Sequence, residues 1–152
     1  MALRKPFRYG TLLRVRQRQE ELKSMALAEM RRAVHYAERQ HAEIVHQQLA
    51  AFSTAAARTR EHFDASDIRR YFLYERHLSR LAVEKDAEIT HLRVQEHERR
   101  NELEQAMKKR KILERLKEHQ DHAYQYALGR EEQKHLDEVA VNRAAVADGP
   151  ST

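Results

Sequence analysis

The stretch Phe63-Asp64-Ala65-Ser66-Asp67 decides the fold of this chain. It is the one plausible reversal in a long run, because no glycine or proline occurs between Gly10 and Gly129. A compact domain would need turn-forming residues within such a run. Asp64 can cap a helix that follows it, and Asp67, three positions later, resembles the second member of a capping box. The sequence therefore predicts two long helices joined by a single turn.

The composition favours thin helical packing over a thick core. Charged residues make up 35% of the chain and aromatic residues 7%, with a mean hydropathy of -0.91. The abundant Ala, Leu, Glu, Arg, Lys and Gln are good helix formers. The absence of cysteine excludes disulfides and thiol chemistry. A transmembrane helix needs about 18 consecutive apolar residues, and the sequence contains no such run. We expect a soluble, cytoplasmic, all-α protein.

The expected architecture is a long antiparallel two-helix coiled-coil hairpin with a C-terminal helix overhang. Residues 1–10 are predicted to form a flexible basic leader, and residues 144–152 a disordered tail. Between them the hairpin, 11–143, has a first helix over 11–62 with Thr11 as its N-cap, a turn over 63–66 and a second helix over 67–143. Gly129 either bends this second helix or is tolerated there at about 1 kcal/mol.

Apolar residues recur at spacings of three and four, which is typical of coiled-coil a and d positions. On the first helix the predicted seam, the line along which the helices pack, is Leu12, Val15, Leu22, Ala26, Met30, Ala33, Ala37, Ile44, Ala51 and Ala55. On the second helix it is Ile68, Tyr71, Tyr74, Leu78, Leu81, Leu92, Leu103, Ala106, Leu113, Leu116 and Ala123, with Lys85 and Arg99 also on seam positions. The seam is therefore narrow and partly polar.

The chain carries a formal net charge of +5, and its charged residues are mostly interspersed. Two basic runs stand out: Arg4, Lys5, Arg8, Arg14, Arg16 and Arg18, and residues 108–111. A turn near residue 64 pairs Leu12 with Lys117, so it brings the basic N-terminal region, through Arg18, beside residues 108–117. Glu20 and Glu21 then neutralise part of this charge. A basic hairpin end can steer association with an acidic partner.

Three stretches, taken in order, resemble the FliJ family. The first stretch, Phe7-Arg8-Tyr9 followed by Leu12-Leu13, is similar to the N-terminal sequence of the family's members. The family's Leu-Glu-x-Leu-Lys-Glu, followed shortly by Tyr, resembles residues 113–118 with Tyr124. Its terminal Glu-x-Lys-x-Leu-Asp-Glu-x-Ala is close to Glu132-Gln133-Lys134-His135-Leu136-Asp137-Glu138-Val139-Ala140.

This resemblance implies a component of the flagellar type III protein export apparatus, and hence a role in motility. Family members form a stalk-like coiled coil that binds the hexameric export ATPase and the export-gate membrane protein, and they handle export chaperones. The implied location is the cytoplasm, with peripheral association at the inner-membrane export apparatus. No nucleic acid partner is implied.

The resemblance also implies two sets of site residues. The ATPase contact belongs to the open end of the hairpin, where the candidates are Arg14, Arg16, Lys108, Lys109, Arg110 and Tyr124. The gate contact lies nearer the turn, where the candidates are Gln40, Ile44, Tyr74 and Leu78. Departures from the family pattern occur nearby: Gln47 and Ala51 stand where some members have aromatic residues, and Lys85 stands where a histidine is expected.

Nothing in the sequence converges on catalysis or cofactor binding. There is no glycine-rich phosphate loop and no nucleophile motif. His119 and His122 share a helical face but lack further ligands, so we expect no metal site. Three alternatives remain open. One is a basic coiled coil that binds nucleic acid, which the interspersed acidic residues disfavour. The others are the equivalent stalk protein of a virulence injectisome and a bare structural spacer with no partner at either end.

Overall fold

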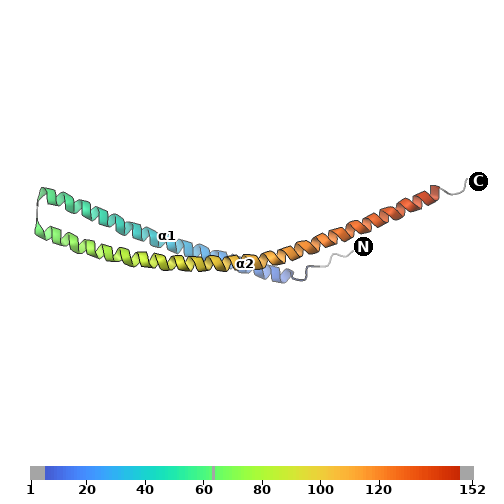
Figure 1. Cartoon of the computed structure of the whole chain (residues 1–152), viewed down its shortest axis with the longest axis horizontal. Helices are drawn as coiled ribbons and strands as arrows, with labels where there is room; N and C mark the ends of the chain where they lie inside the picture. Colours follow the sequence, from blue (N-terminus) through green and yellow to red (C-terminus); the bar gives the residue numbers. More distant parts are fainter. Residues whose placement is uncertain (1–5, 63, 148–152) are drawn as a thin grey trace, which may run out of the picture. The chain divides into compact units, whose positions relative to one another are not determined.

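The computed structural model describes residues 6–62 and 64–147 and contains two α-helices in this range. Helix α1 spans Gly10–Glu61 and helix α2 spans Ala65–Ala147. The two helices run in opposite directions from a short connection, as Figure 1 shows. No strand occurs in the described ranges. The predicted all-α helical hairpin is confirmed. Phe63, the leader residues 1–5 and the tail residues 148–152 lie outside the described residues.

Helix α1 begins one residue earlier than Thr11. The amide of Leu13 donates to the carbonyl of Tyr9 at 2.8 Å, which is the first i to i−4 bond of the helix. The N-cap is the residue whose carbonyl accepts this first bond. Tyr9 is therefore the N-cap, and the predicted capping role of Thr11 is wrong.

Asp64 caps α2, as predicted. Its side chain accepts a hydrogen bond from the backbone amide of Ser66 and another from the Ser66 hydroxyl, both at 2.9 Å. The bond from the Ser66 amide is the main reason that the pKa of Asp64 is lowered from its ordinary value. Asp67 lies in the first turn of α2, where the helix dipole favours a negative charge.

The C-terminal part of α2 is one uninterrupted helix. It runs through Gly129, which has no positive φ and no atom within 4 Å of the position a Cβ would take. The helix also continues through residues 144–147. Three of these four residues are alanine, the best helix former.

Packing divides the chain into two compact units. Unit 1 consists of Met1–Glu20 and Ala106–Thr152, and unit 2 is Glu21–Gln105. In unit 2 the residues buried along the seam are Leu27, Val34, Ala37, Leu78 and Ile89. In unit 1 Leu13 and Leu113 are buried. Within α1, Leu13, Leu27 and Val34 are separated by multiples of seven residues, so they share one heptad position.

The predicted seam is wrong at the start of α1. Leu12, Val15 and Leu22 are 39%, 45% and 51% exposed, whereas Leu13 is only 7% exposed. The heptad phase set by Leu27 and Val34 runs back through Leu13. The predicted seam instead contains apolar residues one position away from this phase. The true seam accepts charged residues instead, among them Glu20 and Lys23, which are both half-buried.

The predicted seam of α2 also needs correction. Tyr74 and Leu116 are 47% and 48% exposed, so they flank the seam. Ile89 was not predicted as a seam residue and is buried. Leu78 and Leu113 are buried as expected. Lys85 lies half-buried on the seam as predicted, whereas Arg99 is exposed.

Hydrogen bonds and ion pairs across the seam of unit 2 fix how its two helix segments are aligned. Lys23 Nζ lies 2.8 Å from Glu102 Oε2, and Gln48 Nε2 donates to Ser79 Oγ at 3.0 Å. Arg93 Nη2 donates to Glu38 Oε1 at 2.6 Å. Each exposed ion pair adds little stability. Their joint effect is to specify an antiparallel alignment that lies within about one turn of the predicted one.

Candidate interaction surfaces

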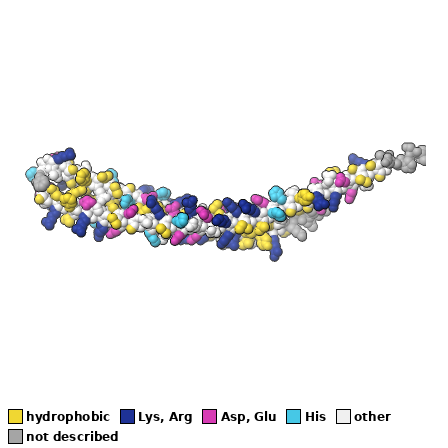
Figure 2. All heavy atoms as spheres, in the orientation of Figure 1, with side chains coloured by type: hydrophobic (Ala, Val, Ile, Leu, Met, Phe, Trp, Pro, Cys, Tyr) yellow, Lys and Arg dark blue, Asp and Glu magenta, His cyan; other side chains and the backbone are white. Residues whose placement is uncertain are grey.

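Unit 1 carries a surface rich in cations. We call it the basic surface, and Figure 2 shows its dark blue side chains beside the start of α1. Residues 6–20 and 106–118 contain ten basic side chains and three acidic ones. The basic residues are Arg8, Arg14, Arg16, Arg18, Lys108, Lys109, Arg110, Lys111, Arg115 and Lys117, and the acidic residues are Glu20, Glu114 and Glu118.

Arg110 plays a different role from the other cations of the basic surface. It lies half-buried on the seam, donating to Glu20 of α1 and to Glu114 of its own helix. The hydrogen bond to Glu20 is the main reason that the pKa of Arg110 is raised above its ordinary value, and the bond to Glu114 acts in the same direction. Arg110 therefore holds two of the three carboxylates of this surface. Its own charge is engaged in the fold.

The remaining ATPase candidates occupy distinct places. Arg14, Lys108 and Lys109 are exposed. Arg16 is half-buried and donates to Gln19 Oε1 at 3.0 Å. Tyr124 is half-buried further along α2. The structure thus brings Arg14 and Arg16 into the same unit as Lys108 and Lys109.

The gate candidates all belong to unit 2, but they differ in accessibility. Tyr74 is 47% exposed, whereas Leu78 is 2% exposed and supports the seam. Gln40 and Ile44 are half-buried and line a groove of about 480 Å³ together with Tyr36. In this groove Gln40 accepts a hydrogen bond from Lys85 Nζ at 2.9 Å. Only Gln40, Ile44 and Tyr74 can meet a partner without opening the seam.

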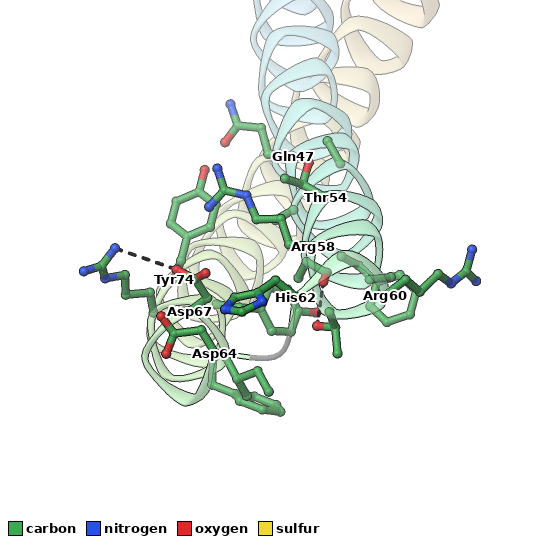
Figure 3. A pocket seen from close by; sticks show the side chains of 18 residues that line it. Gln47, Thr54, Arg58, Arg60, His62, Asp64, Asp67 and Tyr74 are labelled. Atoms are coloured by element: carbon green, nitrogen blue, oxygen red, sulfur yellow. Dashed lines mark hydrogen bonds and ion pairs between the residues drawn. The ribbon is translucent and has the colours of Figure 1, made fainter.

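Next to the turn, the two helices of unit 2 enclose an open cavity of about 860 Å³. Its walls include small residues of α1, such as Ala51 and Ala55, which leave space between the helices. In Figure 3 Gln47 and Tyr74 lie toward one side of this cavity, and Asp64 and His62 lie at the turn. Tyr74 thus lines this cavity, separate from the groove at Gln40.

An aromatic cluster lies beside the cavity. The ring of Tyr71 is 6.5 Å from that of Phe52 and 5.4 Å from that of Phe72. Phe52 and Phe72 are 61% and 62% exposed, while Tyr71 is half-buried. Phe52 was not predicted as a site residue. It stands next to the predicted seam residue Ala51, and this proximity was the available signal.

The middle of unit 2 carries a charged network that spans both helices. Arg31 Nε lies 3.2 Å from Glu96 Oε1, and His35 Nδ1 lies 3.3 Å from Glu38 Oε2. Glu38 also accepts from Arg93, and this bond is the main cause of its lowered pKa. Groups of three or more His, Asp or Glu side chains that could hold a metal ion are absent from the described part of the chain. The network consists of the hydrogen bonds and ion pairs named here.

Neither helix contains, within residues 6–62 and 64–147, an apolar stretch long enough to cross a bilayer.

The geometry defines a class of protein: a helical hairpin with exposed basic, aromatic and polar surfaces, which is typical of interaction proteins. A family model described as "Flagellar FliJ protein" matches residues 5–148. This chain therefore belongs to the FliJ family and has a role in flagellar protein export, with partners in the export apparatus. The family is of a structural and chaperone type. Comparison with curated proteins and with solved structures gave no match.

Proposed function

We propose that this protein is a stalk-like coiled coil that binds the hexameric export ATPase through the basic surface and the export gate through unit 2. The observation that carries this proposal is the excess of cations on the basic surface, where Arg110 engages two of the three carboxylates that residues 6–20 and 106–118 contain. Such a surface attracts an acidic partner and accelerates encounter with it. The protein then promotes ATPase assembly and activity without being an enzyme itself.

The ATPase contact is tested by charge reversal at exposed residues. Lys108→Glu combined with Lys109→Glu should weaken stimulation of the purified cognate ATPase severalfold at low salt, because long-range attraction is lost. Arg69→Glu combined with Arg76→Glu is the matched control, since these exposed arginines belong to unit 2 and are not part of the basic surface. Absence of stimulation by the wild-type protein would contradict the proposal.

The gate contact is proposed for the accessible residues Gln40, Ile44 and Tyr74. Because Leu78 is buried on the seam, its substitution would change the packing of the two helices. Tyr74→Ala combined with Ile44→Ser should reduce co-purification with the gate protein at least fivefold. Val83→Ser, at a residue 70% exposed on α2, is the control and should bind as the wild type does. If co-purification falls equally in both variants, this assignment of the gate contact is wrong.

Handling of export chaperones and peripheral membrane association through the gate belong to the same proposal. Pull-down of export chaperones with the full chain tests the first. Membrane fractionation with and without the gate protein tests the second. The nucleic acid alternative predicts binding to generic duplex DNA with a steep salt dependence. Such binding, together with no ATPase contact, would replace our proposal by that alternative.

A further inference from the structure

Among the apolar side chains that unit 1 exposes, four lie where its two helix segments pack together. Leu12 and Val15 on α1 are 39% and 45% exposed, and Ile112 and Leu116 on α2 are 60% and 48% exposed. We call these four residues the apolar patch. Their neighbours Leu13 and Leu113 are buried and already provide the apolar contact between the helices. The fold of unit 1 thus does not require the patch.

The heptad phase gathers these side chains on one side of the seam. Leu12 comes directly before the seam residue Leu13, and Leu116 comes three residues after the seam residue Leu113, so both hold flanking positions. Val15 and Ile112 lie three and four residues from them along their own helices, which places each pair on one helical face. Figure 2 shows yellow side chains gathered between dark blue ones where α1 begins.

Cations surround the apolar patch. Lys109 and Lys111 precede and Arg115 follows Ile112 on α2, and all three are exposed. On α1 the exposed Arg14 stands between Leu12 and Val15. The carboxylates of Glu20 and Glu114 are held by Arg110. An apolar centre with a basic rim complements a partner with an apolar centre and a carboxylate rim.

We propose that the apolar patch is the anchor by which unit 1 docks onto a protein partner whose surface has an apolar pocket rimmed by carboxylates. This inference rests on the proposed function, in which that partner is the export ATPase. Interfaces concentrate binding energy in a few central apolar and aromatic side chains, while surrounding charges set encounter rate and orientation. The basic rim alone therefore does not account for affinity. Leu12, Val15, Ile112 and Leu116 carry it.

The test separates anchoring from charge attraction. Affinity of the full chain for the purified ATPase is measured by titration calorimetry at several salt concentrations. Leu12→Ser with Ile112→Ser should weaken binding at least about tenfold at every salt concentration, with an unchanged salt slope. Lys108→Glu with Lys109→Glu should weaken binding mainly at low salt and flatten the slope. Val83→Ser with Val94→Ser changes two exposed residues of unit 2 and should leave affinity unchanged.

Circular dichroism confirms that each variant stays folded, and Val15→Ser with Leu116→Gln provides a second variant of the same patch. If wild-type protein binds and both patch variants bind equally well, our inference is overturned while the ATPase proposal stands. If wild-type protein does not bind the ATPase, both fall. Retention on phosphatidylglycerol vesicles that is lost in the patch variants would instead make the patch a lipid-binding surface and overturn our assignment.

Discussion

Arg110 of α2 donates hydrogen bonds to Glu20 on α1 and to Glu114 one turn further along its own helix. The side chains of Arg110 and Glu20 are about one-fifth exposed, at 20% and 21%. This arrangement places a cation on the seam next to the buried Leu113 and links the two helices of unit 1. Because Arg110 engages their charge, Glu20 and Glu114 do little to offset the other cations of the basic surface.

Arg110→Gln should destabilise unit 1 because Glu20 and Glu114 lose their shared cation and repel one another. We expect the melting temperature, followed by circular dichroism at 222 nm, to fall by about 4 °C. Lys108→Gln removes an equal charge from an exposed position and should change it by less than about 1 °C. Equal effects of the two substitutions would show that Arg110 contributes only net charge.

The paired carboxylates predict a loss of stability in acid. Hydrogen bonds from Lys23 to Glu102 and from Arg93 to Glu38 lower the pKa of each glutamate. Their contribution is therefore present above the ordinary carboxyl pKa, roughly 4, and is lost as the pH falls through the lower folded-state value. The melting temperature should thus fall between about pH 5 and pH 2.

Glu102→Gln isolates one of these carboxylates. It should lower the melting temperature at pH 7 by about 2 °C and reduce the change observed between pH 5 and pH 2. Glu98→Gln, at an exposed position on the same helix, is the control and should reproduce the wild-type acid profile. An unchanged acid profile in Glu102→Gln would assign the acid sensitivity to other groups.

Lys85 is a polar residue on the seam whose replacement should stabilise the hairpin. Its ammonium group is tied to Gln40 and Glu88, and its side chain is 21% exposed. Lys85→Leu replaces these polar contacts by apolar contact. At partly buried positions such a replacement often leaves the stability of the folded state unchanged or raises it. We expect a rise in melting temperature of about 3 °C. Lys85→Ala, which supplies no such contact, should lower it.

The cap at Asp64 holds the first turn of α2. Asp64→Ala removes the acceptor of the Ser66 amide and should speed hydrogen exchange of the amides of residues 66–68 at least about fivefold. Ser66→Ala removes only the hydroxyl bond and should have a smaller effect. Exchange that is equally fast in both variants would mean that the backbone bond contributes little.

The hairpin itself was predictable from the sequence because no glycine or proline interrupts the run between Gly10 and Gly129, and because Asp64 offers a cap at which a second helix can begin. The phase of the seam was less predictable. Leu12 and Leu13 are equally apolar, so the choice between them depends on residues far along both helices. Glu20 and Arg110 become favourable seam residues only once they face each other across the hairpin.

The candidate sites show the same limit. The cations of the basic surface were predictable, because the charge of a residue follows from its type and does not depend on how the helices pack. The sequence could not separate Arg110, which is engaged by two glutamates, from the exposed Lys109 beside it. Nor could it separate Leu78 from Tyr74, because their difference in exposure follows from the exact heptad phase.

The narrow seam has an evolutionary consequence. Each cross-section of the hairpin is held by a few side chains that touch only their immediate neighbours, as Lys23 does with Glu102 and Lys85 does with Gln40. The contacts across the seam described above each stay within one unit, as Arg110 with Glu20 does in unit 1 and Lys23 with Glu102 does in unit 2. Substitutions can therefore accumulate at one surface without retuning the rest, which leaves each free to track its own binding partner.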